Sequence, residues 1–499
     1  MVDKIETMLL LLGIVSVLAV IAAKLRFPFP ILLVIAGLLI GLAPGLPTLH
    51  LDPDIVFLIF LPPLLFSAAW NFSWEHFRAN LTPIFGMAVG LVFMTIAAVG
   101  YAVHWMIPGV TLATGFVLGA IISPPDAVAA SAVLKNLRVP KRLMTILEGE
   151  SLVNDASGLV AYHFAVLAVV TGTFSAGEAS LDFLWMAGCG TAVGLLCGMV
   201  VVRMHQTLKD PSVGITLTII TPYVVYLLAE KLESSGVLAV VAAGLYIGNR
   251  SWRVLSSESR LMRDTIWTFI DYILNGLVFI LIGLQFPIFE EQIDKLYIWQ
   301  AVLIGVAVTA ITIVMRFIWL YPMSRLERYV RLRSIEPQSA ITTKGMAVAS
   351  WAGMRGVVSL ATALALPFTT DSGEAFPYRN TIQFVTFVVI FISLVFQGLS
   401  LPWVVRKLGV EDSEADDGAI NSARDVLLET VIKRVDEEIA QTKDESERRA
   451  LEIWQKQFVD RLERLHELNT SEEVEPNWDK IRNLLPKLYT EARHKLTQL

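Results

Sequence analysis

Charged residues are scarce in this chain. Of its 499 residues, 17% are Asp, Glu, Lys or Arg and 55% are hydrophobic, whereas a soluble domain has about a quarter charged residues. The mean hydropathy is +0.60. This composition excludes an ordinary soluble protein and predicts a polytopic membrane protein. The formal net charge is -6 and no basic stripe is present, so we expect no nucleic-acid partner.

Cysteines and the motifs of enzymes are also rare. The two cysteines, Cys189 and Cys197, lie in one apolar segment, where a helix would separate them by about 12 Å, beyond disulfide reach. The sequence contains no Walker loop, no zinc-ligand spacing and no nucleophile elbow. It therefore indicates neither ATP-driven nor hydrolytic chemistry, and we expect neither an enzyme nor a bound cofactor.

Long hydrophobic stretches fill the chain as far as residue 408. About thirteen of them approach the ~20 residues that a helix needs to cross a bilayer. Their limits are about 7–23, 28–43, 53–70, 82–104, 111–134, 143–170, 182–203, 212–231, 236–248, 263–285, 297–321, 344–366 and 380–405. The first has no A-x-A cleavage site and a second follows directly, so we expect a spanning helix and not a signal peptide. The predicted fold class is an all-α polytopic membrane protein, with residues 1–408 as the transmembrane domain.

Lysine and arginine are unequally shared between the loops. One set of alternate loops is rich in them, whereas the other set and the N-terminus carry only Lys4, Lys231, Lys295 and Arg379. Cytoplasmic loops hold the excess of Lys and Arg in membrane proteins. The rich set includes Arg78, Lys135, Arg142, Arg203, Arg250, Arg325 and Lys344. We therefore expect a periplasmic N-terminus and a cytoplasmic C-terminus.

The chain changes character after Gly409. An acidic segment, residues 411–417, precedes two amphipathic helical patterns. Their apolar stripes are Val426, Leu427, Val431, Val435 and Ile439, and then Trp454, Phe458, Leu462 and Leu465. We expect residues 409–499 to form a small cytosolic helical tail. A regulatory or self-associating tail with an unknown regulator, and a charged bundle that only keeps this end soluble, are equally favoured.

A polar face is predicted in the middle of the sixth stretch. Glu150, Ser151, Asn154 and Asp155 fall within one arc of about 140° on a helix. Asp155 lies about 20 Å along the axis from Arg142, near the middle of a hydrocarbon core about 30 Å thick. A charge at that depth costs roughly 2.5 to 3.5 kcal/mol and marks a functional site by default. The alternative for Asp155 is a hydrogen-bonded structural carboxylate.

The fifth stretch is predicted to break inside the membrane, at Ser123-Pro124-Pro125-Asp126. Each proline removes a backbone donor and clashes with the preceding turn. Irregular backbone at this depth is tolerated where it lines a cavity, which is how transporters build cation sites. Asp126 can cap the half-helix that follows, and a cap without any ion-binding role is the alternative for it.

The twelfth stretch is predicted to unwind around Arg355, which Gly353 and Gly356 flank. Arg355 lies about 16 Å in from the cytoplasmic end, close to the depth of Glu150, so we predict a buried Glu150–Arg355 ion pair with a structural role. Broken helices at matching depth in the two halves of the chain are expected of inverted repeats. Arg316 is expected to snorkel to the cytoplasmic end of its helix.

Asp271 and Asn275 share a helix face at i, i+4. A helix-packing hydrogen bond is the favoured interpretation, with support of the site as the alternative.

These motifs resemble the monovalent cation:proton antiporters, in particular the sodium/proton exchanger branch typified by prokaryotic NhaP-like proteins. The matching segments are Phe60–Phe66, Ser123–Ala129, Glu148–Asp155 and Gly353–Gly356, in family order across nearly all of the membrane part. The resemblance implies a bacterial inner-membrane homodimer of thirteen-helix protomers. Each protomer would have a dimerisation domain and a core domain in which two broken helices cross.

The same resemblance implies site residues. Asp155 would be the carrier carboxylate that binds Na⁺, with Asn154 supporting it. Ser151 and the broken segment from Ser123 to Asp126 would help to coordinate the ion. Two departures affect this set: Pro125 stands where many members have threonine, and Ser67 stands where many have an acidic residue.

The expected mechanism is competition at one carboxylate. A low-dielectric site favours its protonated form, and a bound cation favours its charged form, so H⁺ and Na⁺ exclude each other. One carboxylate exchanging one ion for the other predicts electroneutral antiport by alternating access. Li⁺ or K⁺ also suit oxygen ligands, and K⁺/H⁺ antiport is the first alternative. The second, from another class, is an ion channel or a membrane sensor that signals through the tail.

Overall fold

The computed structural model contains two compact units, residues 1–411 and 412–499. The described residues are 2–43, 53, 56–135, 137, 139–173, 176–208, 210–254, 257–293, 297–331, 342–410, 415–441, 445, 448–449, 451–453, 455–456 and 459. Within these ranges the regular structure is helical and no β-strand is formed. The predicted all-α fold class is confirmed.

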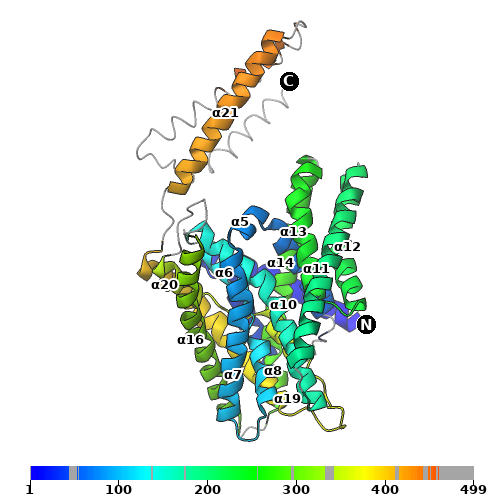
Figure 1. Ribbon diagram of the computed structural model, residues 1–499, viewed down its shortest axis with the longest axis vertical. Coiled ribbons are helices and arrows are strands. Elements are labelled where there is room, and N and C mark those ends of the chain that lie inside the picture. Colours follow the sequence, from blue (N-terminus) through cyan, green and yellow to red (C-terminus); the bar gives the residue numbers. More distant parts are fainter. Residues whose placement is uncertain are drawn as a thin grey trace. The chain divides into compact units, whose positions relative to one another are not determined.

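The membrane unit is a bundle of helices with three π-helical segments (Figure 1). Its first half contains α1 (Val2–Leu25), α2 (Phe29–Gly41), η1 (Val56–Phe60), α4 (Leu61–Asn71), α5 (Trp74–Ala79), α6 (Leu81–Phe85), η2 (Gly86–Leu91), α7 (Val92–Met106), α8 (Leu112–Ile122), α9 (Ala127–Leu134), α10 (Lys141–Thr171) and α11 (Ala176–Thr207). Its second half contains α12 (Pro211–Lys231), α13 (Gly236–Val254), α14 (Ser257–Leu284), α15 (Phe286–Glu291), α16 (Ile298–Arg331), α17 (Thr343–Trp351), α18 (Val357–Leu364), α19 (Arg379–Ile392), η3 (Ser393–Gln397) and α20 (Gly398–Leu408).

Most of the predicted spans are long enough helices to cross a membrane. In the described part of the chain, 9 helical segments are long and apolar enough to cross a membrane, and Phe29–Gly41 and Val56–Asn71 are shorter apolar helices. Two predicted spans remain. One falls on α13, and the other is divided between α17 and α18. The count of thirteen spans stays a prediction.

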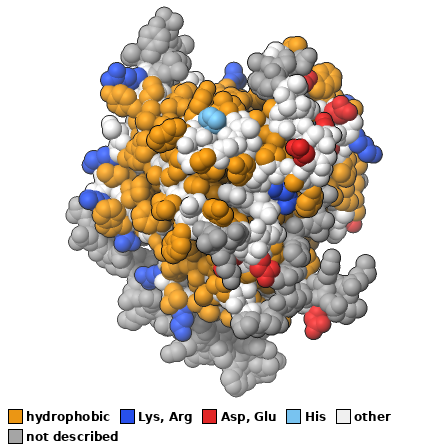
Figure 2. Space-filling view, turned by 90° about the horizontal axis from the view of Figure 1, so that it is seen from below, with side chains coloured by type: hydrophobic (Ala, Val, Ile, Leu, Met, Phe, Trp, Pro, Cys, Tyr) orange, Lys and Arg blue, Asp and Glu red, His pale blue; other side chains and the backbone are white. Residues whose placement is uncertain are grey.

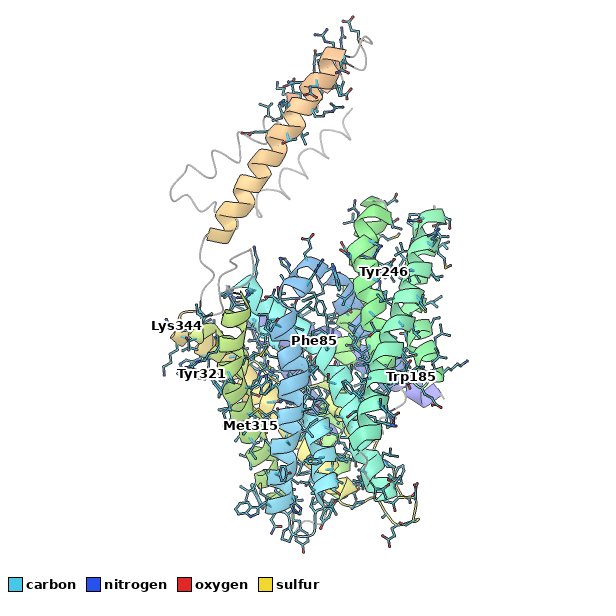
Figure 3. The ribbon with its side chains drawn as sticks, in the orientation of Figure 1. Phe85, Trp185, Tyr246, Met315, Tyr321 and Lys344 are labelled. Carbon is cyan, nitrogen blue, oxygen red and sulfur yellow. The ribbon has the colours of Figure 1, made fainter. Side chains whose placement is uncertain are left out.

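The outside of the bundle is apolar, as a surface in contact with lipid requires. Figure 2 shows hydrophobic side chains spread over much of one face, with a few charged groups among them. Trp185 of α11 is 60% exposed and Leu303 of α16 is 65% exposed, and Trp185 points outward in Figure 3. Apolar side chains of this size at the surface indicate a bilayer environment.

Small residues let the helices inside the bundle approach closely. Gly194 of α11 lies against the backbone of Ala239 in α13, and Gly37 of α2 lies against the backbone of Ile280 in α14. Close backbone approach is the main source of van der Waals packing between helices in a membrane. α10 lies among these helices, between the α7–α8 side and the α11–α13 side in Figure 1, and contacts α8, α9 and α13.

Two helices are broken, and their breaks meet. α8 and α9 are separated by residues 123–126, and α17 and α18 by residues 352–356. The backbone N–H of Asp126 in the first break donates to the carbonyl oxygen of Met354 in the second, at 2.7 Å. The expected crossing of two broken helices is confirmed, and it leaves half-helix ends in the interior of the bundle.

The second unit contains α21 (Ala415–Gln441) (Figure 1). Arg434 forms ion pairs with Glu437 and Glu438 one turn away. Such exposed pairs stabilise a helix weakly. The second predicted apolar stripe, of which Phe458 and Leu462 are members, lies outside the described residues. The domain boundary at residues 408 and 409 stays a prediction.

Candidate functional site

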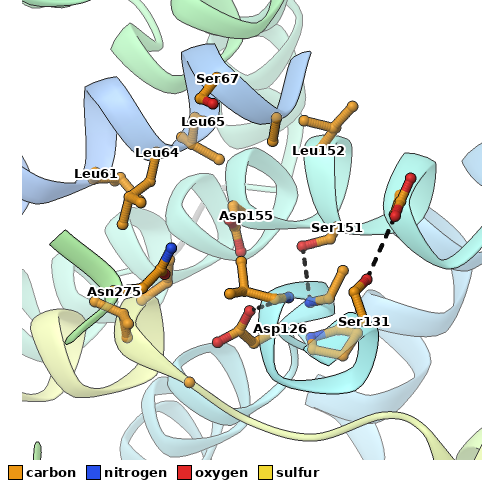
Figure 4. Close-up of a pocket in the computed structure, with 18 of the residues that line it drawn as sticks. Leu61, Leu64, Leu65, Ser67, Asp126, Ser131, Ser151, Leu152, Asp155 and Asn275 are labelled. Carbon is orange, nitrogen blue, oxygen red and sulfur yellow. Dashed lines mark hydrogen bonds between the residues drawn. The ribbon is translucent and has the colours of Figure 1, made fainter. Parts of the chain in front are cut away.

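A cavity of about 380 Å³ lies beside the crossing of the broken helices (Figure 4). Its walls come from α4, α9, α10, α14 and the start of α18. Among its described lining residues, the carboxylates are Asp126, Glu148, Asp155 and Asp271, and the basic residue is Lys135. A cavity with an excess of negative charge and low-dielectric walls attracts cations.

Asp155 extends from α10 into this cavity (Figure 4). The residue is 7% exposed. Its carboxylate forms no hydrogen bond and no ion pair with any residue that the structure describes, although buried carboxylates normally have such partners. The alternative of a hydrogen-bonded structural carboxylate therefore does not fit the described surroundings. The cavity supplies room for a partner that is not part of the chain.

Asn154 and Ser151 hold the first break against α10. The side-chain N–H of Asn154 donates to the carbonyl oxygen of Pro125 at 3.0 Å, and the hydroxyl oxygen of Ser151 accepts from the backbone N–H of Ala127 at 3.3 Å. Both partners are backbone groups that the broken helix leaves without a helical partner. Ser151 lines the cavity beside Asp155, whereas Asn154 is 0% exposed. The two side chains therefore fix the geometry of the break.

Asp126 caps the second half-helix. Its Oδ1 accepts from the backbone N–H of Val128 at 2.8 Å, as an N-cap residue does. Its carboxylate also lies directly on the backbone of Gly356, where any β-carbon would overlap it. The side chain lines the same cavity as Asp155 (Figure 4). Asp126 thus joins the two breaks and places a second carboxylate at the crossing.

The predicted ion pair between Glu150 and Arg355 is wrong. Glu150 pairs with Arg316, whose two terminal nitrogens donate to Oε1 and Oε2 at 2.6 Å each. The Nε of Arg316 donates to the carbonyl oxygen of Ala349 at 2.9 Å. Both members of the pair are buried, Glu150 at 1% and Arg316 at 2% exposure. A bidentate pair with its remaining donor satisfied is the geometry in which buried charges are best compensated.

The expectation that Arg316 snorkels is wrong for the same reason. The Arg316 side chain is 2% exposed, and its donors bind Glu150 and the Ala349 carbonyl oxygen inside the bundle. Its stem passes against Gly353, where a β-carbon would lie 2.9 Å from the Arg316 Cδ. A glycine in the second break thus makes room for the arginine that binds Glu150.

Arg355 is buried at 3% exposure in the second break. Its backbone N–H donates to the hydroxyl of Ser393 at 3.0 Å. Its Nε and Nη1 have no hydrogen-bond partner among the described residues. It contributes backbone to the break and does not share the hydrogen bonds of Glu150.

Ser123 does not line the cavity, whereas Pro124 does. The Ser123 hydroxyl donates to the carbonyl oxygen of Ala120 in its own helix at 3.2 Å. Pro124 packs against Gly158, where a β-carbon would lie 2.9 Å from the proline ring. The structure therefore brings together Asp126, Ser151 and Asp155 on one cavity and directs the Ser123 side chain elsewhere.

Ser67 and Asp271 are cavity residues whose contact the sequence did not predict. The Ser67 hydroxyl in α4 donates to Oδ2 of Asp271 in α14 at 2.5 Å. The Ser67–Asp271 bond is a hydrogen bond between packed helices, as predicted for this face, and within α14 the side-chain N–H of Asn275 donates to the carbonyl oxygen of Asp271 at 2.8 Å. The i, i+4 spacing of Asp271 and Asn275 was the available signal for a polar face. Ser67, which lies 204 positions from Asp271 in the sequence, carried no signal that the two residues meet.

In the described part of the chain, fold and site define a helical polytopic membrane protein in which two broken helices cross beside a buried carboxylate that has no partner among those residues. The family described as "Sodium/hydrogen exchanger, transmembrane" matches residues 9–407. The chain belongs to this family. It is 33% identical over 461 residues to the Na(+)/H(+) exchanger YjcE of Escherichia coli, covering 88% of this chain and 84% of that protein.

Two further proteins are similar to the chain. It is 35% identical over 425 residues to the "Sodium, potassium, lithium and rubidium/H(+) antiporter" of Bacillus pumilus, and this match covers 82% of the chain but 62% of that longer protein. The solved structure of the sodium proton antiporter MjNhaP1 from Methanocaldococcus jannaschii matches with a TM-score of 0.65 at 20% identity, covering 82% of this chain and 99% of that one. The structural match shows a shared fold.

Proposed function

We propose that this protein is a secondary antiporter that exchanges Na⁺ for H⁺, with Asp155 binding either ion in turn. The observation that carries the proposal is the Asp155 side chain, which is 7% exposed, faces a cavity and has no hydrogen-bond or ion-pair partner among the described residues. A carboxylate in that position needs a proton or a cation to offset its burial. The names of the relatives, which print Na(+)/H(+) exchange and monovalent cation/H(+) antiport, support the same reaction.

Competition at this carboxylate couples the two ions. Burial favours the neutral carboxylic acid, and a cation at coordination distance favours the carboxylate, so one ion leaves when the other binds. Oxygen ligands suit hard cations, and the hydroxyl of Ser151 and the carboxylate of Asp126 line the same cavity. The Asn154 side-chain N–H binds Pro125, and Asn154 is not among the residues that line the cavity, so Asp155 is the carrier and Asn154 a positioning residue.

Transport follows if the membrane unit alternates between two accessible states while Asp155 is occupied. The cavity in the described state extends to Lys135 and Glu148, near the end of the bundle that the distribution of lysine and arginine assigns to the cytoplasm. This state is therefore the inward-facing one. With one carrier carboxylate the exchange is one H⁺ for one monovalent cation, and it is electroneutral. The functional unit is a homodimer in a bacterial inner membrane.

K⁺/H⁺ exchange is the second candidate. It is favoured by the name of the Bacillus pumilus relative, which prints sodium, potassium, lithium and rubidium. Carboxylate and hydroxyl oxygens bind all of these ions. The order of preference among Na⁺, Li⁺ and K⁺ is measured by adding each in turn to the same vesicles.

Reconstitution of the full chain into liposomes with an internal pH dye tests the function. Addition of Na⁺ outside should change the internal pH for the parent and not for Asp155→Asn. Asp264→Asn serves as the matched control, because Asp264 is exposed and forms its ion pair with neighbouring Arg263. A channel would instead pass cations without any pH change. A rate that depends on the membrane potential would contradict electroneutral exchange.

A further inference from the structure

Asp271 is a further carboxylate of the cavity; it is partly buried and belongs to α14, not to α10. α14 contacts α4 and α18, and both Asp271 and Asn275 line the cavity that Asp155 enters. Figure 4 shows Asn275 and Asp155 bordering the same space, with Ser67 on the neighbouring helix α4. Asp271 and Asp155 therefore line one cavity from two different helices.

The two oxygens of Asp271 have different surroundings. Oδ2 accepts the Ser67 hydroxyl at 2.5 Å, whereas Oδ1 is buried and has no hydrogen-bond partner among the described residues. A carboxylate oxygen without a donor in this setting lacks the compensation that buried polar atoms normally have. Asp271 also forms no ion pair with Lys135, the basic residue that lines the same cavity. One oxygen is thus fixed in orientation by Ser67, while the other has no donor among the described residues.

Asp155 provides an independent indication that the cavity accepts a cation. It is more than nine-tenths buried, faces the same space and has no partner among the described residues. Two carboxylates from different helices, α10 and α14, therefore border one cavity, each with oxygen atoms that have no donor among the described residues. Hard alkali cations are bound by sets of such oxygens, and a single carboxylate supplies too few.

We propose that Asp271, oriented by Ser67, is a further cation-binding carboxylate, which attracts and positions the monovalent cation for Asp155. This proposal rests on the proposed antiport function and adds a residue to it. Asp271 acts on the cation and not on the proton balance, because Asp155 alone carries the exchanged charge. Removing Asp271 should weaken the binding of the cation and leave the carrier step intact.

The test is a comparison of cation dependence in liposomes for Asp271→Asn, the parent and the exposed-residue control Asp264→Asn. Loss of one charged ligand costs on the order of 1.4 kcal/mol, so Asp271→Asn should raise the KM for Na⁺ about tenfold while the maximal rate stays within about twofold. Asp264→Asn should keep the parental KM. A purely structural role for Asp271 would instead lower the maximal rate or the yield of folded protein and leave the KM unchanged.

A double variant separates ligand loss from misfolding. Ser67→Asp combined with Asp271→Ser transposes the carboxylate across the same hydrogen bond and keeps it in the cavity, so the KM for Na⁺ should return to within about threefold of the parent. A parental KM in Asp271→Asn, or a double variant that is folded but no better than Asp271→Asn, overturns the proposal. If Asp155→Asn still exchanges, the proposed function itself fails. If Asp155→Asn loses exchange and Asp271→Asn keeps the parental KM for Na⁺, Asp271 is not a ligand and the function stands.

Discussion

Arg316 donates from both terminal nitrogens to the two carboxylate oxygens of Glu150, each at 2.6 Å, in the interior of the bundle. The pair links α16 to α10, the helix that carries Asp155. A third donor of Arg316 binds the carbonyl oxygen of Ala349 at the end of α17. One arginine therefore connects the carrier helix to one of the two broken helices.

Removing Arg316 should destabilise the protein far more than removing Arg355. Arg316→Met leaves the Glu150 carboxylate buried without its partner, which costs about 3 to 5 kcal/mol. Arg355→Met removes a guanidinium whose Nε and Nη1 have no hydrogen-bond partner among the described residues. Thermal unfolding in detergent measures the difference, with Arg325→Met as a control, because Arg325 contacts Tyr321 at the exposed surface. Equal losses for Arg316→Met and Arg355→Met would contradict the assignment.

The prediction chose the wrong partner for Glu150 because it relied on how deep each arginine lies in the membrane. The predicted span ended near residue 321 and placed Arg316 within reach of water, whereas the Arg316 side chain is 2% exposed and binds Glu150 in the interior. Two arginines then lie at similar depth, and depth alone does not tell which faces Glu150. The choice is made by the packing of α16 against α17, a tertiary contact.

A β-carbon at residue 356 should disrupt the crossing of the broken helices. Gly356→Ala places a methyl group onto the Asp126 carboxylate, so either the cap of α9 or the second break has to move. We expect exchange to fall at least about tenfold, since displacements of about 1 Å at a site have effects of that size or more. Gly188→Ala is the matched control, because nothing lies within 4 Å of a β-carbon there. Parental exchange rates in Gly356→Ala would show that the crossing tolerates displacement.

The breaks themselves were predictable because their causes are local. Two successive prolines at 124 and 125 and the glycines at 353 and 356 act on their own backbone, and the structure is non-helical at residues 123–126 and 352–356. The contacts between residues that line the cavity were not predictable in the same way. Ser67 meets Asp271 only because α4 and α14 pack together, and no local pattern records that contact.

Asn154 should affect stability and exchange through its hydrogen bond to the Pro125 carbonyl oxygen. Asn154→Ala leaves that buried acceptor without its donor, at a cost of about 1 to 3 kcal/mol, and loosens the break beside Asp155. We expect a lower melting temperature and a reduced maximal rate of exchange. Ser157→Ala is the control one turn along α10, because the Ser157 hydroxyl bonds only to the carbonyl oxygen of Val153 in its own helix. Equal melting temperatures and exchange rates in the two variants would contradict a positioning role for Asn154.

Removal of the tail should leave exchange intact. A stop after Gly409 deletes the second unit and retains every residue that lines the cavity. Exchange in liposomes should therefore persist with the parental KM for Na⁺. Complete loss of activity in a truncated protein that still folds would favour a sensor that acts through the tail.

Proton release on cation binding tests the central claim most directly. Purified protein in weakly buffered detergent solution, near the pH at which exchange is half-maximal, should release up to about one proton per protomer when NaCl is added, because Na⁺ displaces H⁺ from Asp155. Choline chloride should release none, and neither should Asp155→Asn with NaCl. Binding of Na⁺ to the parent without any release of protons, or equal release from Asp155→Asn, would contradict the account.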